Sequence, residues 1–333
     1  MKPLDQPNTI TLSDSPRGVR AAVGLLRAGE LVAFPTETVY GLGADAGNDR
    51  AVAGIYAAKG RPSFNPLIAH VSDLWRAEQL TVMTPAARAL GTAFWPGPLT
   101  MVLPRRGGPV ALSELATAGL PTVAVRVPAH DLARRLLEAF GGPLAAPSAN
   151  LSGKMSPTRR EHVLEGLDGR IAAVFEGGPC EIGLESTIIG FDGDTPVLLR
   201  PGGLPVEAIE AVLGIAVDTR VLGHVTAPGQ MESHYAPRAR LRLDASGPGA
   251  DEVWLGFGPL AALRPGPNLS PGGDLVEAAA NLFSHLRAAD ALALELGASR
   301  IAVAPVPAEG LGLAINDRLR RAAAPRPEDL TYG

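Results

Sequence analysis

Apolar and polar residues follow two periods along the chain, one helical and one typical of strands, and together they predict an α/β fold. Between Ser15 and Gly29, apolar residues recur every three or four positions behind a Ser-Pro pair that is typical of a helix start. The continuous apolar run 31–34 that follows is typical of a buried strand. Because some predicted strands follow one another directly, we expect a twisted mixed sheet with flanking helices rather than a purely parallel sheet.

The same alternation extends over most of the chain. Helices are expected from about residue 48 to 60, from 84 onward, over 130–140, from 274 onward and over 310–323. Strands are expected at 67–71, 99–103, 122–127, 144–146, 171–174, 187–191, 197–199, 252–257 and 301–306. The segment 35–43 is expected to be a polar loop.

A length of 333 residues corresponds to about two domains. Both periods fade between about residues 214 and 240, where Pro228, Gly229 and Pro237 interrupt the chain. We therefore predict a first domain over 1–213, an ordered linker over 214–240, and a small Rossmann-like α/β domain over 241–333.

The composition agrees with a folded protein and narrows the classes of partner. Hydrophobic residues make up 46% and charged residues 19%, which argues against a disordered chain, so the 39 glycines and 31 prolines are expected in structured turns. The net charge of −4 argues against the broad basic surface that tight nucleic-acid binding needs. We expect at most weak RNA binding.

Cys180 is the single cysteine, so the chain cannot form an intramolecular disulfide, and it has no Cys/His cluster with the four ligands of a structural zinc site. A cytoplasmic location is therefore expected. The first 15 residues contain no apolar targeting segment, and no run of about 18 apolar residues follows. Neither processing nor membrane association is expected.

Two polar loops that each follow a predicted strand are candidate ligand sites, because α/β folds bind ligands at strand ends. The first reads P-T-E-T-V-Y-G-L-G over 35–43, and the second reads P-S-A-N-L-S-G-K-M-S-P-T over 147–158. Each could equally be an ordinary solvated loop. Residues 41–46 formally fit the dinucleotide pattern G-x-G-x-x-A, but the first glycine lies too far from the strand and no acidic residue follows about twenty positions later, so we exclude nicotinamide binding.

Lysine is rare in this chain, which has 30 Lys and Arg residues of which only Lys2, Lys59 and Lys154 are lysine. A GC-rich genome explains the ratio, and a cation before Gly60 also suits the end of a helix. Neither reason explains a lysine at position 59. A compact ammonium that contacts a phosphate as a point charge does explain it.

Two charged or titratable residues interrupt apolar strands, His70 and Arg126. A histidine in a strand is more often a core residue with satisfied hydrogen bonds than a ligand-binding residue. An arginine there needs an anionic partner, which is either a carboxylate of the core or a bound anion. No G-x-x-x-x-G-K-[ST] motif is present, so scattered cations and hydroxyls would have to hold any phosphate.

Seven motifs follow one another along the sequence: PTETVYGLGADA, KGRPSFNPLIAHV, FWPGPLTMVL, VAVRVPAH, APSANLSGKMSPT, GLESTII and LLRPG. In this order and spacing they resemble the motifs of the YrdC-type threonylcarbamoyl-AMP synthase family. Two later segments, PGQMESHYAP and GLGLAINDRL, resemble the long, two-domain form of this family. The resemblance implies a YrdC-like catalytic domain and a linker that closes over the active site.

The resemblance further implies the reaction of L-threonine, bicarbonate and ATP to threonylcarbamoyl-AMP and pyrophosphate, which serves modification of tRNA at A37. Lys59 and Arg61 match the family's catalytic K-x-R pair. The residues implied for L-threonine are Thr36, His70, Arg126, Ser148 and Ser186. Those implied for ATP are Lys59, Ser63, Thr122, Asn150, Thr158, Arg200 and Tyr235. Mg²⁺ is expected on the phosphates without a dedicated protein cage, and the downstream partners would be tRNA threonylcarbamoyl transferase proteins.

Two other functions remain open at this point. Domains of this type also occur in RNA-binding or ribosome-maturation proteins, against which the net charge of −4 argues. Similar domains also occur in proteins that transfer a carbamoyl group during hydrogenase maturation. Those proteins carry additional zinc-binding cysteines, whereas this chain has only Cys180.

Overall fold

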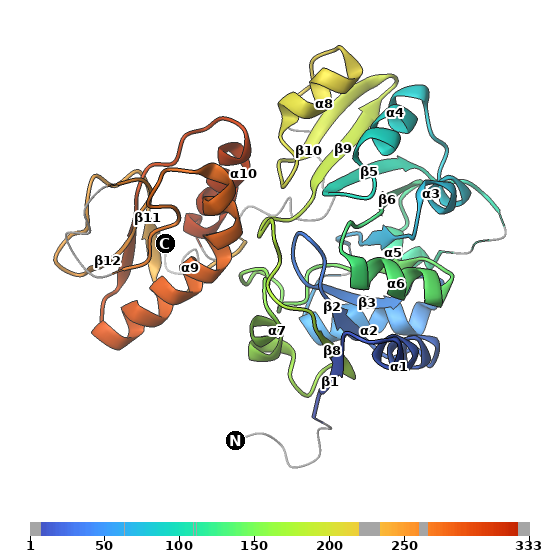
Figure 1. The fold of residues 1–333 in the computed structure, drawn as a ribbon, viewed down its shortest axis with the longest axis horizontal. Helices are drawn as coiled ribbons and strands as arrows, with labels where there is room; N and C mark the ends of the chain where they lie inside the picture. Colours follow the sequence, from blue (N-terminus) through green and yellow to red (C-terminus); the bar gives the residue numbers. More distant parts are fainter. Residues whose placement is uncertain are drawn as a thin grey trace. The chain divides into compact units, whose positions relative to one another are not determined.

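The computed structural model describes residues 8–62, 64–108, 110, 112–219, 234–259 and 266–325. The chain divides into two compact units (Figure 1). The first contains residues 1–152, 156–181 and 185–230, and the second contains 153–155, 182–184 and 231–333. Most of the expected linker, residues 220–233, lies outside the described residues.

Among the residues described, the first unit contains a ten-stranded sheet, and this sheet is mixed, as the sequence predicts. Its strands are β1 Ile10–Ser13, β2 Val32–Phe34, β3 Gly41–Asp45, β4 Ile68–His70, β5 Leu99–Pro104, β6 Thr122–Arg126, β7 Leu144–Ala145, β8 Ala173–Glu176, β9 Thr187–Asp192 and β10 Thr195–Arg200. Their spatial order is β1-β8-β2-β3-β7-β4-β6-β5-β9-β10. Parallel and antiparallel pairs alternate irregularly, since β4 pairs parallel with β6 and antiparallel with β7.

Helices flank this sheet, and local sequence fixes their ends. They are α1 Pro16–Arg27, α2 Asp49–Lys59, α3 Leu74–Leu80, α4 Pro85–Phe94, α5 Glu114–Thr117, α6 Asp131–Phe140, α7 Arg160–Leu167 and α8 Val206–Leu213. The side chain of Asn48 accepts hydrogen bonds from the first backbone N–H groups of α2. Gly60 ends α2 in the left-handed region, which places Lys59 at the helix end that the sequence predicts.

The expectation of a polar loop over 35–43 is wrong at its end, because β3 begins at Gly41. Two glycines in G-L-G-A-D hide the strand from a pattern based on β-forming residues. A Cβ at Gly43 would lie 2.8 Å from Cε1 of Phe34, so the ring of the neighbouring strand requires a glycine here. Gly43 of the apparent dinucleotide pattern therefore serves strand packing.

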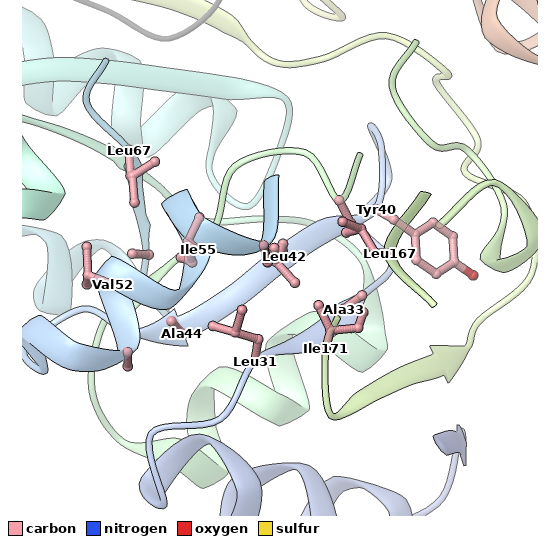
Figure 2. Close-up of a cluster of buried hydrophobic side chains, with 14 of the residues drawn as sticks. Leu31, Ala33, Tyr40, Leu42, Ala44, Val52, Ile55, Leu67, Leu167 and Ile171 are labelled. Carbon is pink, nitrogen blue, oxygen red and sulfur yellow. The ribbon is translucent and has the colours of Figure 1, made fainter. Parts of the chain in front are cut away.

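Helix α2 packs on β3 through apolar side chains. Val52 and Ile55 of the helix lie beside Leu42 and Ala44 of the strand (Figure 2). All four are fully buried. Their burial anchors both ends of the first polar loop, because β2 and β3 pair antiparallel on either side of it.

The second unit has the small Rossmann-like pattern that the sequence predicts. Its parallel strands are β11 Arg240–Arg242, β12 Glu252–Leu255 and β13 Arg300–Val303, and its helices are α9 Leu275–Leu296 and α10 Leu311–Ala323. The β13 strand lies in the middle. Of the helices that the structure describes in either unit, none has both the length and the apolar character to cross a membrane.

Candidate active site

The alternation of side chains along four neighbouring strands places polar groups on one face of the first unit's sheet. Apolar residues lie on this face too and form a cluster of Ile68, Val102, Ala124 and Ile188. Each of them is two residues away from one of the polar residues, which are His70, Thr100, Arg126 and Ser186. The opposite face packs against α3, α4 and α8 in a larger apolar core, and Figure 1 shows α4 and α8 beside β5, β9 and β10.

Arg126 is held on this face by three acceptors. Its Nη2 donates to Oε1 of Glu37 at 2.7 Å, its Nη1 donates to Oγ1 of Thr38 at 2.9 Å, and its Nε donates to the backbone carbonyl of Gly97 at 3.2 Å. The side chains of Arg126 and Glu37 are only 4% and 6% exposed. The guanidinium is therefore fixed in place, and two of its five N–H donors are not used by the described residues.

Thr36 shapes the loop that brings these acceptors to Arg126. Its Oγ1 accepts hydrogen bonds from the backbone N–H groups of Thr38 and Val39, both at 3.2 Å, and lies 2.7 Å from Oγ1 of Thr38. This is the local side-chain turn that threonine favours. The turn explains why a polar loop is buried, since its hydroxyls satisfy its own backbone.

Glu37 and Thr38 were not among the predicted site residues. A signal for Glu37 existed, because the arginine in the apolar strand requires an anionic partner and this carboxylate lies in a loop already singled out. Cys180 is buried close to Thr36, Glu37 and Arg126. Burial raises the pKa of this thiol to about 12, so it is a neutral part of the wall.

His70 is a neutral neighbour of Arg126. The two residues are partners in the parallel register of β4 and β6, and Nδ1 of His70 lies 3.3 Å from the backbone carbonyl of Ile68. Burial first, and the Arg126 charge second, lower the pKa of His70 to about 3. At pH 7 the imidazole can thus donate or accept hydrogen bonds without adding charge.

Replacing His70 by Gln is expected to change how stability depends on pH. Below pH 6.5 the unfolded chain binds a proton that the folded His70 refuses down to about pH 3, so folding stability decreases as the pH decreases through that window. The contribution is about 1.4 kcal/mol per pH unit at most. In urea unfolding, the free energy of unfolding should decrease less between pH 7 and pH 5 in the variant than in the wild-type chain. Parallel losses in both proteins would contradict the assignment.

Ser186 and Arg200 form a second group on the same face. Oγ of Ser186 lies 2.7 Å from Oγ1 of Thr100, and Nη2 of Arg200 donates to the backbone carbonyl of Ser186 at 2.8 Å and to its Oγ at 3.2 Å. Arg200 is buried, like Arg126. Gly202 lets the segment after Arg200 approach the backbone around Ser186, because a Cβ at position 202 would lie 2.4 Å from backbone atoms of residues 185–187.

Gly202→Ala is therefore expected to destabilise the first unit by about 1–3 kcal/mol, as overpacking against backbone does. It should also lower activity, because the shift displaces Ser186. Gly24→Ala is the matched control: this glycine is exposed in α1, and a Cβ added there would meet no atom within 4 Å, so alanine should stabilise the helix by up to about 1 kcal/mol. Equal effects in thermal unfolding would refute the role of Gly202.

Lys59 joins the helix α2 to the second polar loop. Its Nζ donates to the backbone carbonyls of Ser148, at 2.5 Å, and of Asn150, and the side chain is buried. Burial first, and the nearby Arg61 charge second, lower its pKa well below the usual value. These carbonyls use two of the three ammonium donors, and the residues that the structure describes leave the third available to an anion.

The other predicted residues lie as follows. Arg61 donates to the backbone carbonyls of Asn65 and Pro66 at 3.4 and 3.1 Å. Thr122 begins β6, and Oγ1 of Thr158 lies 3.4 Å from Nδ1 of His162. Ser63 lies outside the described residues.

Tyr235 lies in the other unit, where its ring is buried 5.3 Å from that of Phe283 with the Arg318 guanidinium 5.4 Å from its centre. Its role toward ATP stays a prediction. Within the described part of the chain, no group of three or more His, Cys, Asp or Glu side chains is placed to hold a metal ion.

Two family models cover most of the chain. The Sua5–YciO–YrdC model, described as telomere recombination, matches residues 24–202, and a model described as the C-terminal domain of threonylcarbamoyl-AMP synthase matches residues 204–324. Relatives named threonylcarbamoyl-AMP synthase share this extent. The Bacillus subtilis protein is 44% identical, over 96% of this chain and 96% of its own. The Pyrococcus abyssi protein is 44% identical, over 92% of this chain and 94% of its own.

Solved structures agree with these matches. The crystal structure of P. abyssi Sua5 complexed with L-threonine has a TM-score of 0.84 and 40% identity, and the match covers 95% of this chain and 97% of that one. Escherichia coli YciO, at 24% identity and a TM-score of 0.52, covers 58% of this chain and 95% of its own and is similar in fold.

Proposed function

Since this chain belongs to the Sua5/YrdC family of threonylcarbamoyl-AMP synthases, we propose that it converts L-threonine, bicarbonate and ATP to threonylcarbamoyl-AMP, pyrophosphate and water. The product is the activated intermediate for threonylcarbamoyladenosine at tRNA position A37. The observation that carries this proposal is the buried, fixed Arg126 beside a neutral His70, on one face of a sheet. The P. abyssi relative was crystallised with L-threonine.

Arg126 would bind the carboxylate of L-threonine through its two remaining N–H donors, which suits planar recognition of a carboxylate. His70 and Ser186 project from the same face, so they would contact the rest of the amino acid. Thr36 would act through the turn that it holds, and Ser148 would close the pocket from the second polar loop. Each of these groups is uncharged at pH 7 apart from Arg126, so they position the substrate rather than titrate with it.

Lys59 would contact the phosphates of ATP, with Arg61 next to it, and so stabilise the charge that develops during transfer. Asn150 shares the loop that Lys59 holds. The other nucleotide contacts that we propose are Ser63, Thr122, Thr158, Arg200 and Tyr235. Catalysis would consist of positioning and charge neutralisation.

The chemistry has two steps. The α-ammonium group of L-threonine loses a proton to become an amine, and bicarbonate takes up a proton and splits into CO2 and water. The amine nitrogen then attacks the carbon of CO2 and loses a second proton to solvent, which gives a carbamate. A carbamate oxygen then attacks the α-phosphorus of ATP in line, and the bond to pyrophosphate breaks. A site that gathers a carboxylate, a carbamate and a triphosphate needs several fixed cations, which agrees with the buried positions of Lys59, Arg126 and Arg200.

We also propose that Mg²⁺ enters with ATP and neutralises phosphate charge. The described residues offer hydroxyls and cations at the site rather than a carboxylate cluster, which suits a metal held by the phosphates. Threonylcarbamoyl-AMP is a mixed anhydride, so an acyl transferase that acts on tRNA must consume it. With a net charge of −4, this chain would bind RNA weakly at most.

Pyrophosphate release by the purified full chain tests this function. Release from ATP should require both L-threonine and bicarbonate. Release that is independent of L-threonine would refute the substrate assignment, and salt-sensitive RNA binding without any ATP turnover would favour the RNA-binding alternative.

A further inference from the structure

Glu37 is a buried carboxylate with one oxygen that no described residue satisfies. The side chain is 6% exposed, and Oε1 accepts the hydrogen bond from Nη2 of Arg126. Oε2 is buried without a hydrogen-bond partner in the structure. Leaving a charged acceptor unsatisfied in the interior is costly, so a donor from a ligand is the natural partner.

The charges around Glu37 specify what kind of ligand fits. Arg126 supplies one positive and Glu37 one negative charge, so the pair is neutral, and the adjacent His70 and Cys180 are uncharged at pH 7. A neutral pair of opposite charges complements a zwitterion, whose carboxylate meets the arginine and whose ammonium meets the carboxylate. A ligand with a carboxylate alone would leave Oε2 unsatisfied.

We propose that Glu37 is a specificity residue of the amino-acid pocket, where its Oε2 accepts a hydrogen bond from the α-ammonium of L-threonine. This rests on the proposed function, because it assigns a contact within the same pocket. The contact is charge-assisted, which makes it stronger than one to the substrate hydroxyl. It also selects amino acids over hydroxy acids of the same shape, because the site's buried acceptor is unpaired when the amine is missing.

Binding of three ligands to the full chain tests this assignment by calorimetry. L-Threonine and L-2-aminobutanoate carry the ammonium, whereas (R)-3-hydroxybutanoate keeps the carboxylate and hydroxyl of threonine but lacks the amine. Glu37→Gln preserves size and an acceptor for Arg126 and removes the charge. We expect about 10- to 100-fold weaker binding of the two amino acids, and a change of less than about threefold for the hydroxy acid.

Thr38→Val is the matched control for a role through Arg126 alone. It removes the hydrogen bond to Nη1 of Arg126 and the contact with Oγ1 of Thr36 but keeps the Glu37 carboxylate, so it should weaken all three ligands in parallel. If Glu37→Gln also weakens all three equally, Glu37 merely positions Arg126 and the proposal is overturned. Selective loss of the two hydroxyl-bearing ligands would assign Oε2 to the hydroxyl and overturn it too.

The proposed function and this contact fail in different ways. A wild-type chain that neither binds L-threonine nor needs it for pyrophosphate release overturns both. A wild-type chain that needs L-threonine, beside a folded Glu37→Gln variant with unchanged affinity for it, overturns the Glu37 contact alone. Circular dichroism of each variant establishes that it is folded.

Discussion

Replacing Lys59 by Met is expected to lower kcat by about 10²- to 10³-fold, the loss typical of removing one fixed donor from a developing negative charge. Methionine keeps much of the buried stem and removes the ammonium. In the wild-type chain, two N–H donors of the Lys59 ammonium bind the carbonyls of Ser148 and Asn150, and the third would contact a phosphate. Steady-state kinetics with ATP varied at saturating L-threonine measure the effect.

Lys154→Met is the matched control, because this lysine lies in the polar segment 147–158, whose carbonyls Lys59 contacts, but is exposed. It should keep kcat within about twofold. Lys59→Arg should not restore activity, since a planar guanidinium cannot replace a compact ammonium between two carbonyls. Full activity in Lys59→Arg would show that the site needs only a positive charge.

Replacing Arg126 by Met is expected to destabilise the first unit by about 3–5 kcal/mol, because it leaves the Glu37 carboxylate buried without its counter-charge. The double variant Arg126→Met with Glu37→Met should recover most of that loss, since it removes both charges and replaces them with apolar groups of similar size. Both variants should lose L-threonine binding, although only the double variant regains stability. The loss of binding is therefore not a result of unfolding.

Urea unfolding followed by tryptophan fluorescence measures this prediction. In a Trp254→Phe background, the remaining Trp75 and Trp95 both lie in the first unit, so the signal reports on that unit. A single variant as stable as the double variant would show that Glu37 does not depend on Arg126.

The fold was predictable from the sequence where elements are long and apolar. Helix α2 illustrates this, since Asn48 and Gly60 mark its ends and its apolar face is regular. Strand β3 was missed because it begins with Gly-Leu-Gly, and the ring of Phe34 requires the second of these glycines, Gly43, through a contact between strands that local pattern cannot show. Helix α8 and strand β1 were missed for a related reason: they are short, and tertiary packing stabilises them.

Some residues of the candidate site could also be identified from the sequence, and others could not. His70 and Arg126 are identifiable because charged or titratable residues in apolar strands need partners, and the structure puts them side by side. Glu37 was not identified as that partner, because nothing in the local sequence shows which of many carboxylates folds against the guanidinium. The pairing depends on the Thr36 turn and on the order of β2 and β6 in the sheet.

The fate of the bicarbonate carbon tests the proposed activity most directly. The full chain, incubated with ATP, L-threonine and ¹³C-labelled bicarbonate, should form a nucleotide whose mass is that of AMP joined to threonylcarbamate, with one labelled carbon between nitrogen and phosphate. The labelled product should be absent when L-threonine is omitted. Formation of AMP and pyrophosphate in which no nucleotide carries the label would contradict the assignment.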